Sequence, residues 1–498
     1  LFYQRREQIM EMETNHMSEE LTNEIKKRRT FAIISHPDAG KTTLTEKFLL
    51  YGGAINTAGS VKGKANSKYA VSDWMEIEKE RGISVTSSVL QFKYDDFCIN
   101  ILDTPGHQDF SEDTYRTLMA ADSAVMVIDA SKGVEAQTIK LFKVCVMRHI
   151  PIFTFINKMD REARDSFELL DDIESVLGIR TCPVNWPIGS GKRFKGIYDR
   201  RAKTVRTFES VSTGGAKSAA ETDYDINDPA LKELATEELY DQLIDEIELL
   251  DGASDPLDLE QVQKGELSPV FFGSALTTFG VETFLKYFLE MTTSPLPRMS
   301  NEGEIDPLTN DFSAFVFKIQ ANMNKAHRDR IAFLRICSGK FQADKEVYHV
   351  QSGRKLRLSQ PQQIMAQDRQ VISEAYAGDV IGVFDPGLFS IGDTITMPGS
   401  KFEYEGIPTF APEHFARVIQ LNSMKRKQFV KGITQIAQEG AIQIFQEYTA
   451  GMSEIIVGVV GVLQFDVLKY RLENEYGCEI RLESLPYGFI RWVGDPTT

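Results

Sequence analysis

The sequence predicts a multidomain α/β fold, in which a domain with a parallel-rich sheet is followed by a β-barrel domain and a ferredoxin-like α+β domain. Three observations predict this fold. Short apolar runs alternate with helix-length amphipathic segments from Thr30 to Leu296, and glycine-punctuated strand-like pieces run from Phe312 to Pro398. From Phe415 onward the order is strand, helix, strand, strand, helix, strand. A chain of 498 residues is long enough to bury these separate cores.

In the first domain, five short apolar runs are typical of buried strands. They are rich in residues that favour strands, and helix-length stretches such as Phe110–Ala121 separate them. This alternation favours a parallel sheet that is covered on both faces. The five predicted strands are Phe31–Ser35, Cys98–Asp103, Ala124–Asp129, Ile152–Asn157 and Val270–Gly273. A polar, acidic insertion interrupts the pattern at about residues 186–266, with helical periodicity from Pro229 to Leu250.

The changes in pattern set the expected domain boundaries. Residues 1–27 are expected to form an N-terminal leader or extension, with Met17 as a plausible native start. The S-P-L-P stretch before residue 298, followed by polar residues, indicates a linker. We therefore expect the first domain at 28–297, the linker at 298–311, the β-barrel at 312–411 and the α+β domain at 412–498.

Composition limits the classes of function. No apolar run of about 18 residues is present, so no membrane-spanning helix is expected. The five cysteines are scattered without a C-x-x-C pair, which favours neither zinc nor disulfides and fits a reducing cytoplasm. The net charge of −16 argues against loose binding to a polyanion. If RNA is a partner, local basic patches such as Lys26 to Arg29 must make the contact; the alternative is a solvated charged face.

The first motif is a phosphate-binding loop at residues 35–42, which read S-H-P-D-A-G-K-T directly after a predicted strand and before a helix, Thr43–Leu50. Gly40 lets backbone amides curl toward an anion, and the helix N-terminus adds positive potential. Lys41 would reach the β- and γ-phosphates, and the Thr42 hydroxyl would ligate Mg²⁺. Ser35 stands where the pattern asks for Gly, and a chance G-K-T is the alternative interpretation.

The second motif, D-T-P-G-H at residues 103–107, follows the strand that ends at Asp103. A carboxylate there can hold Mg²⁺ through a water, and the Gly106 amide can meet a γ-phosphate and swing away when it leaves. Alone, this motif is equally typical of an ordinary turn that leaves a strand.

The third and fourth motifs indicate a site for the base of a nucleotide. N-K-M-D at residues 157–160 ends another strand, and the Asp160 carboxylate can accept both donors that guanine offers at N1 and its 2-amino group. Adenine would leave that carboxylate badly paired. G-S-A-L at residues 273–276 follows the last strand, where a backbone amide would face the guanine O6. Each motif alone could be a surface turn, but four strand-end loops in one order predict a shared nucleotide site.

The segment Asp73–Thr86 has the position of a nucleotide-sensing switch, between the first two motifs. A hydroxyl in this segment is expected to close the coordination of the Mg²⁺. Ser84 is the first choice and Thr86 the second. The alternative is an exposed, charged loop without a role at the site.

These motifs resemble those of the translational GTPases, the family of the ribosomal elongation, initiation and release factors. R-G-I-S at 81–84, D-T-P-G-H and N-K-M-D carry the resemblance, with Ser84 where the family usually has Thr. Longer segments, among them SDWMEIEKERGISVT, FKGIYD and VGVLQFDVLKYRLENEYG, extend it from Arg28 to Val493 and favour the release-factor branch.

The resemblance implies a P-loop GTPase domain, a β-barrel domain and an α+β domain that continues a little beyond Thr498. It implies a cytoplasmic, ribosome-stimulated GTPase of translation termination that drives class-I release factors off the ribosome, with no membrane or DNA partner. It also implies that His107 positions the attacking water when the sarcin–ricin loop of ribosomal RNA pushes it into place. From the residues alone, His107 could equally be a solvated switch residue.

The predicted site is therefore a GTP–Mg²⁺ site. We expect the catalytic groups to be His107, Lys41 and Gly106, and the metal ligands to be Thr42, Ser84 and, through a water, Asp103. The predicted GTP-binding residues are Ser35, His36, Pro37, Asp38, Ala39, Gly40, Lys41, Thr42, Thr43, Asp103, Thr104, Pro105, Gly106, His107, Asn157, Lys158, Met159, Asp160, Ser274, Ala275 and Leu276. The alternatives are an elongation-type translocase, a non-hydrolysing assembly protein gated by nucleotide and, disfavoured by N-K-M-D, a P-loop ATPase.

Overall fold

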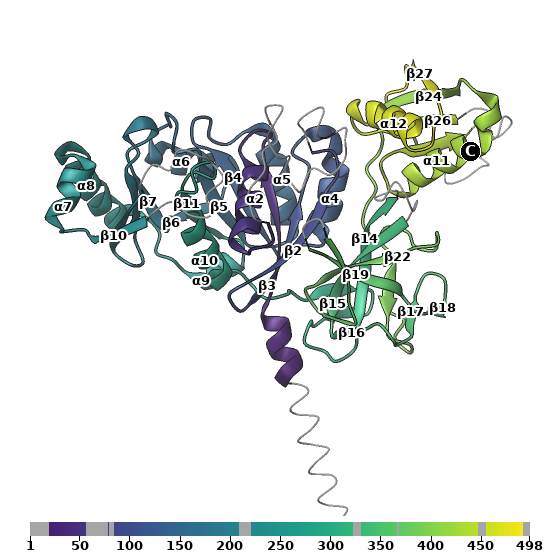
Figure 1. The fold of residues 1–498 in the computed structure, drawn as a ribbon, viewed down its shortest axis with the longest axis horizontal. Helices are drawn as coiled ribbons and strands as arrows, with labels where there is room; N and C mark the ends of the chain where they lie inside the picture. Colours follow the sequence, from purple (N-terminus) through teal and green to yellow (C-terminus); the bar gives the residue numbers. More distant parts are fainter. Residues whose placement is uncertain are drawn as a thin grey trace, which may run out of the picture.

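The computed structural model describes residues 19–55, 78, 84–208, 221–321, 330–365, 368–446 and 455–491. Figure 1 shows an α/β domain at the centre, its insertion at one end with α7 and α8, and a β domain and a small α+β domain at the other end. The predicted order of domain types along the chain is confirmed.

The central sheet has seven strands in the order β2-β3-β1-β4-β5-β11-β6. Every neighbouring pair is parallel except β2 and β3, so the parallel-rich sheet is confirmed. The edge strands β2 and β6 were not predicted. The strands are β1 (Arg28–Ser35), β2 (Ser88–Tyr94), β3 (Phe97–Asp103), β4 (Ser123–Asp129), β5 (Ile152–Asn157), β6 (Arg180–Pro183) and β11 (Leu267–Phe272).

Helices cover both faces of this sheet because its strands are apolar on both sides. In β1, Phe31 and Ile33 belong to one buried cluster, while the alternating Ala32 and Ile34 belong to another. The helices α2 (Lys41–Tyr51) and α10 (Val281–Met291) contribute to the first cluster. The helices α4 (Ser111–Met119), α5 (Ala136–Met147) and α6 (Ser166–Leu177) contribute to the second.

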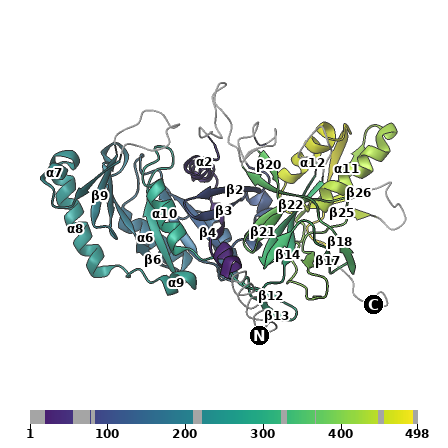
Figure 2. The same cartoon turned by 60° about the horizontal axis from the view of Figure 1, so that its bottom comes forward.

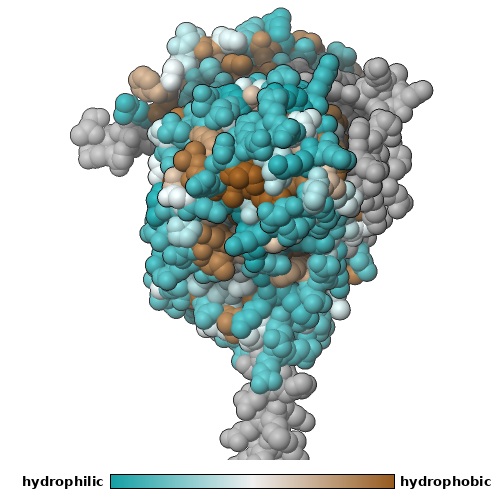
Figure 3. Space-filling model, turned by 90° about the vertical axis from the view of Figure 1, so that its left-hand side faces the viewer, coloured by the Kyte–Doolittle hydropathy of each residue, from teal (hydrophilic) through white to brown (hydrophobic). Residues whose placement is uncertain are grey.

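The insertion forms its own antiparallel sheet, with β7 to β10 in the order β10-β9-β8-β7. The helix expected from Pro229 to Leu250 is two helices, because Thr236 has a φ of 76° and breaks the helical hydrogen bonding. Figure 3 looks onto this end of the molecule, where hydrophilic residues cover most of the surface. The elements are β7 (Asn185–Ile188), β8 (Gly196–Asp199), β9 (Thr204–Phe208), β10 (Glu221–Asp225), α7 (Pro229–Ala235), α8 (Glu237–Ala253) and α9 (Leu259–Gln263).

Only part of the predicted N-terminal basic patch lies on the surface, because Lys26 is exposed whereas the two arginines of the run are buried. Arg28 and Arg29 begin β1 and are only 6% and 9% exposed. Arg28 pairs with Asp379 of the β domain, and Arg29 donates a hydrogen bond to the Leu289 carbonyl. Both arginine side chains therefore make their contacts inside the protein and cannot reach RNA in this arrangement.

Parts of the expected N-terminal extension and of the expected linker form regular secondary structure. Residues 19–26 are helical, and Leu21 and Ile25 of this helix are buried in the core of the β domain. Residues 1–18 of the expected leader lie outside the described residues. Within the expected linker, β12 (Arg298–Ser300) and β13 (Gly303–Ile305) pair as an antiparallel hairpin.

The β domain contains an eight-stranded sheet in the order β18-β17-β23-β14-β15-β22-β19-β20 and a smaller sheet of β16 and β21. It packs on the central sheet through the turn at Gly378, whose φ is 103°. A Cβ at Gly378 would lie 2.6 Å from the Cβ of Arg28, so only glycine fits here. The strands are β14 (Ser313–Ala321), β15 (Arg330–Ser338), β16 (Lys340–Gln342), β17 (Val347–His349), β18 (Arg354–Leu356), β19 (Ser359–Met365), β20 (Asp368–Val371), β21 (Glu374–Tyr376), β22 (Val380–Phe384) and β23 (Thr394–Thr396).

The C-terminal domain has the predicted ferredoxin-like order. Its four strands form an antiparallel sheet in the order β25-β26-β24-β27, against which two helices pack. Figure 2 shows this domain beside the β domain, at the end of the molecule away from the insertion. The elements are β24 (His414–Gln420), α11 (Arg426–Gln438), β25 (Gln443–Gln446), β26 (Ile455–Val459), α12 (Leu463–Asn474) and β27 (Ile480–Leu485).

Candidate nucleotide-binding site

A cavity of about 570 Å³ lies at the carboxyl ends of the central parallel strands. This edge is where open α/β sheets bind ligands. Loops that are far apart in the sequence meet here, and most of the predicted residues line the cavity. The predicted residues that line it are Ser35, His36, Pro37, Asp38, Gly40, Lys41, Thr42, Thr43, Ser84, Gly106, His107, Asn157, Lys158, Asp160 and Leu276.

The loop between β1 and α2 has the backbone shape of an anion cradle. Asp38 and Gly40 have positive φ angles of 66° and 105°, which turn the chain tightly around the start of α2. Gly40 is the N-cap, and neither a capping side chain nor an acidic residue occupies the first turn. The first amides of a helix have no partners within the helix, so this N-terminus can donate to phosphate oxygens.

Lys41, which lines the cavity, forms a buried ion pair with Asp103 behind it. The distance from Lys41 Nζ to Asp103 Oδ1 is 2.5 Å, and the two side chains are 7% and 2% exposed. Thr45 Oγ1 also donates to the same carboxylate oxygen, at 3.4 Å. The ammonium group is therefore held between the phosphate-binding loop and the end of β3, where a triphosphate tail could reach it.

Asn157 ties the phosphate-binding loop to the last loop of the site. Its Nδ2 donates to the Ala39 carbonyl, and its Oδ1 accepts from the Ala275 amide, both at 2.8 Å. A Cβ at Gly40 would lie 2.1 Å from Asn157 Nδ2. Glycine is thus required at residue 40 by both its φ angle and this close approach.

Lys158 spans the cavity beside the base-binding motif. Its Nζ donates to the Asp38 carbonyl at 2.5 Å and to Asp129 Oδ2 at 2.6 Å. Burial by itself would raise the pKa of Asp129, but hydrogen bonds from Lys158 and Ser131 outweigh burial and hold the pKa below its usual value. Asp129 therefore stays ionised and holds the Lys158 ammonium group beside the cavity.

Asp160 is oriented by the fourth loop. Ser274 Oγ donates to Asp160 Oδ1 at 2.5 Å, and Met159, directly before it, donates its N–H to the Gly273 carbonyl at 3.1 Å. The Asp160 side chain is 19% exposed. One serine hydroxyl thus sets the direction of the carboxylate that was predicted to read the base.

His107 lies at the cavity rim beside Gly106. Its Nδ1 accepts a hydrogen bond of 3.2 Å from the Asp109 amide, so the ring caps the turn that precedes α4. The His107 side chain is 32% exposed. A Cβ at Gly106 would be 3.6 Å from the Cα of Pro37, so the second motif packs directly on the phosphate-binding loop.

Some predicted binding residues lie behind the cavity and support its loops. Thr104 donates through its hydroxyl to the Ile33 carbonyl at 2.8 Å, and Pro105 accepts from Thr114 at 3.1 Å. These backing residues do not line the cavity themselves. They are Ala39, Asp103, Thr104, Pro105, Met159, Ser274 and Ala275.

Between the two candidate metal-binding hydroxyls, the structure brings Ser84 to the cavity. Thr86 instead lines a separate space between the three domains. Most of the remaining switch segment, residues 73–77 and 79–83, lies outside the described residues.

The structure also brings four residues to the cavity that the sequence interpretation missed, namely Asp129, Ser131, Lys132 and Arg161. Asp129 ends β4, which was predicted as a strand. Because Asp129 ends a predicted strand, the strand-end rule also points to Asp129, Ser131 and Lys132. Arg161 directly follows the N-K-M-D motif.

The donor set suits Mg²⁺. Thr42, Ser84 and Asp103 offer hard oxygen donors, and Mg²⁺ in nucleotide sites takes few protein ligands because phosphates and water supply the others. Among the described residues, no group of three His, Cys, Asp or Glu side chains could hold a metal on its own.

Three family models match consecutive parts of the chain. They are "Elongation factor Tu GTP binding domain" at residues 26–294, "Elongation factor G domain 2" at 311–397 and "Class II release factor RF3, C-terminal domain" at 404–498. Together they follow the three domains of the fold.

Two curated relatives are both named peptide chain release factor 3. The one from Symbiobacterium thermophilum is 60% identical over 473 residues, which are 95% of this chain and 89% of the relative. The one from Gloeobacter violaceus is 57% identical over the same shares of both chains. A crystal structure of a Thermus thermophilus protein superposes with a TM-score of 0.74 at 22% identity, covering 92% of this chain and 67% of that one. That likeness concerns the fold alone.

Proposed function

This chain belongs to the peptide chain release factor 3 family of translational GTPases, and we propose that it hydrolyses GTP to drive class-I release factors off the terminating ribosome. The chain is a GTPase of translation termination that interacts with the ribosome. The observation that carries the proposal is the meeting of four strand-end loops in one cavity, in a chain whose last domain matches the release-factor model.

Guanine is the base that the site is proposed to read. Ser274 fixes one oxygen of Asp160, and an ionised carboxylate can accept from N1–H and the 2-amino group of guanine. The Ser274 amide donates to Phe279 and the Ala275 amide to Asn157, so Leu276, which lines the cavity, is the residue proposed to offer its amide to the guanine O6. Adenine would leave the Asp160 carboxylate poorly paired.

The triphosphate is proposed to lie across the N-terminus of α2. The amides around Gly40 and the Lys41 ammonium would share its negative charge. Thr42 and Ser84 would hold a magnesium ion, with Asp103 behind them, and the ion would neutralise charge on the β- and γ-phosphates. The contact between Gly106 and Pro37 brings the second motif to the end of the phosphate-binding loop, where loss of a γ-phosphate would be sensed.

Hydrolysis is proposed to occur by in-line attack of water on the γ-phosphate. His107 would position this water from the cavity rim, and Lys41 would stabilise the transferring group. Among the described residues that line the cavity, Arg161 is the only arginine, and it lies beside the base-binding motif. No internal arginine finger is therefore proposed, and hydrolysis without the ribosome should be slow.

The remaining parts of the proposal concern partners and location. We propose that the sarcin–ricin loop of ribosomal RNA places His107, and that the protein works in the cytoplasm. The helices of the described residues include none with the length and hydrophobicity of a membrane span. An elongation-type translocase is the main alternative, and the release-factor match at residues 404–498 speaks against it.

The test is GTP hydrolysis by the full chain with ribosomes that carry a stop codon and a class-I release factor. We expect ribosome-stimulated hydrolysis and faster turnover of the class-I factor with GTP. Stimulated movement of tRNA on ribosomes with sense codons, without any effect on class-I factors, would instead identify a translocase.

A further inference from the structure

A second cavity lies where the first domain, the β12–β13 hairpin and the β domain meet. It has a volume of about 250 Å³ and is called here the junction cavity. Its walls include Asp122, directly before β4, and Ile150, two residues before β5. The junction cavity therefore lies at the amino ends of the parallel strands, whereas the nucleotide cavity lies at their carboxyl ends.

Two arginine side chains converge in the junction cavity on one backbone oxygen. Arg298 Nη1 donates to the Met119 carbonyl at 2.5 Å, and Arg148 Nη2 donates to the same oxygen at 3.5 Å. A guanidinium group has five N–H donors. These are the only hydrogen bonds of the two side chains within the described part of the chain. The Nε atoms of both arginines are buried without an acceptor among the described residues.

Burial makes this arrangement electrostatically costly. Arg298 is 8% exposed, and burial lowers its pKa to about 10, an effect to which the charge of Arg148 adds. Burial also lowers the pKa of Arg148, and the charge of Asp122 offsets this only in part. Like charges that are buried together need an anion nearby, because low dielectric strengthens their repulsion and water cannot solvate them.

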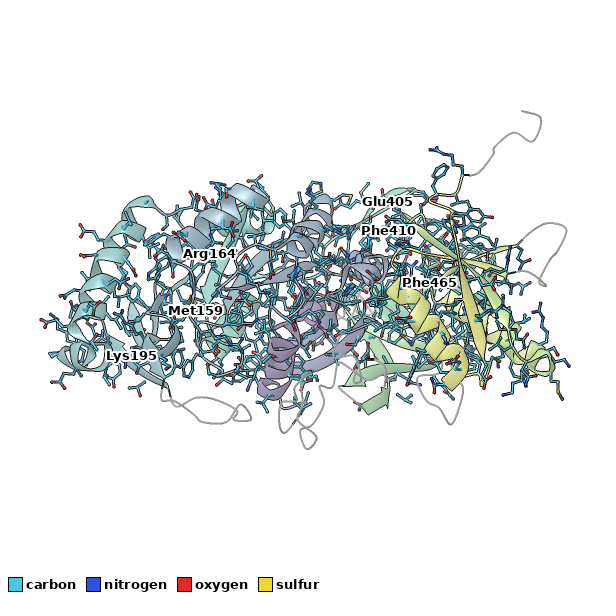
Figure 4. All side chains as sticks on the ribbon, turned by 90° about the horizontal axis from the view of Figure 1, so that it is seen from above. Met159, Arg164, Lys195, Glu405, Phe410 and Phe465 are labelled. Carbon is cyan, nitrogen blue, oxygen red and sulfur yellow. The ribbon has the colours of Figure 1, made fainter. Side chains whose placement is uncertain are left out.

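The buried carboxylate of the cavity, Asp122, already has partners. Asp122 accepts from Arg335 Nη2 with one oxygen and from the Leu296 amide, at 3.2 Å, with the other. Glu405 also lines the cavity and its charge acts to raise the pKa of Arg148, but its side chain is exposed and no hydrogen bond joins it to either Arg148 or Arg298. Figure 4 labels Glu405 between the ribbons of the first and last domains. The cavity thus holds a positive pair without a dedicated counterion.

Packing explains only part of this pair. Arg298 lies over the ring of Phe315, with its guanidinium carbon 4.8 Å from the ring centroid, which is favourable for a cation. The ring covers one face of Arg298 and supplies no acceptor for the N–H groups that do not donate to the Met119 carbonyl. It also does not explain why Arg148 is brought to the same carbonyl oxygen.

We propose that the junction cavity binds a small, free oxyanion of the phosphate class between Arg148 and Arg298. Guanidinium groups match tetrahedral oxyanions because their N–H donors form a planar fork. A free ion fits better than a phosphate of a polymer, since Arg298 is almost entirely buried. The anion would join the first domain, which supplies Arg148, to the hairpin that supplies Arg298, and so hold the β domain against the first domain.

Binding of inorganic phosphate to the full chain tests this proposal. The nucleotide site is first filled with a non-hydrolysable GTP analogue and magnesium, so that phosphate cannot use the loop before α2. Isothermal titration and thermal unfolding are then measured with phosphate against chloride at constant ionic strength. We expect saturable binding that raises the melting temperature. Lack of saturable binding by the unmodified chain overturns the proposal.

Variants locate the site. Arg148→Gln removes one partly buried guanidinium group. Arg298→Lys keeps the positive charge but removes the planar guanidinium group. Both variants should therefore still fold. Because hydrogen bonds to charged groups are strong, each variant should weaken phosphate binding by roughly tenfold or more. Arg481→Gln, an exposed arginine of the last domain, is the matched control and should bind phosphate normally. Equal phosphate binding by all three variants and the unmodified chain would refute the assignment.

A variant of Glu405 is the last measurement of the experiment. If Glu405 were the internal counterion of the two arginines, Glu405→Gln would lower the melting temperature in the absence of phosphate. The proposal expects no such loss, because the carboxylate is exposed and makes no hydrogen bond to the pair. A clear loss of stability would therefore count against an external anion.

Discussion

The carboxylate of Asp109 accepts a hydrogen bond of 2.8 Å from the backbone amide of Leu463, although 354 positions separate the two residues. Asp109 follows His107 by two residues, and Leu463 begins α12 of the C-terminal domain. Around this bond, Val85, Phe110 and Val467 form a small apolar cluster. The C-terminal domain thus directly contacts the turn that carries His107. Through this contact the domain can influence the proposed site of hydrolysis.

Gly461→Ala should break this contact. A Cβ at Gly461 would lie 2.3 Å from side-chain atoms of Asp109 and 2.4 Å from its Cα, so the two elements must separate. We expect a loss of about 1–3 kcal/mol in the free energy of unfolding, as for other forced overpacking. Denaturant unfolding measures it, with Gly406→Ala as the control because nothing lies within 4 Å of its added Cβ. Equal stability of the two variants would show that the contact is not maintained in solution.

His107→Ala should abolish ribosome-stimulated hydrolysis while leaving GTP binding nearly unchanged. The side chain lies at the rim of the cavity, and its hydrogen bond with the Asp109 amide stays within its own turn, so its loss should act on the reaction. We expect a fall of about 100-fold or more in the stimulated rate, the usual size of a lost positioning group. His414→Ala, an exposed histidine of the C-terminal domain, is the control. A normal stimulated rate in the His107 variant would remove His107 from the mechanism.

Ser274→Ala should reduce the preference for guanine. Without the 2.5 Å hydrogen bond from Ser274, the Asp160 carboxylate can rotate. Guanine binding must then fix the orientation of the carboxylate, which makes the free energy of binding less favourable. A hydrogen bond to a charged group is worth about 1.5–3 kcal/mol, so GTP affinity should fall by roughly 10- to 100-fold. Weak ATP binding should not change. Competition titrations measure both nucleotides, with Ser175→Ala on the exposed face of α6 as the matched control.

Asn157→Ala should destabilise the protein even without nucleotide. The substitution leaves the Ala39 carbonyl and the Ala275 amide without their partner inside a buried region. Each unpaired buried group costs about 1–3 kcal/mol, so a clear drop in melting temperature is expected. An unchanged melting temperature with weaker GTP binding would mean that Asn157 contacts the nucleotide and does not bridge the loops.

Asp129 should make stability depend on pH in acid. Its pKa is lower in the folded chain than in the unfolded chain, where a free Asp titrates near about 3.9. Its contribution is therefore complete above that unfolded value and is lost as the pH falls through the lower folded value. Asp129→Asn should be less stable than the unmodified chain at pH 7, and the difference should shrink in acid. Denaturant unfolding between about pH 3 and pH 7 measures this, and a constant difference would contradict the assigned pKa direction.

Local patterns determined much of this protein. The apolar runs that end at Ser35, Asp103 and Asn157 predicted both the strands and the loops that follow them. Parallel strands bring their carboxyl ends to one edge, so a correct order of strands already predicts that these loops meet. The order of elements after Phe415 likewise predicted the ferredoxin-like domain, because alternation and helical period are properties of neighbouring residues.

Only the tertiary structure decided which side chains face a neighbour. Arg28 and Arg29 looked like an exposed basic patch, yet they are buried because a second domain packs on β1. Ser84 and Thr86 both carry a hydroxyl in the switch segment, but they line different cavities. Arg148 and Arg298 come together on one carbonyl oxygen although 150 positions separate them. Burial and charge pairing depend on contacts between distant segments, and the period of a local sequence carries no information about those contacts.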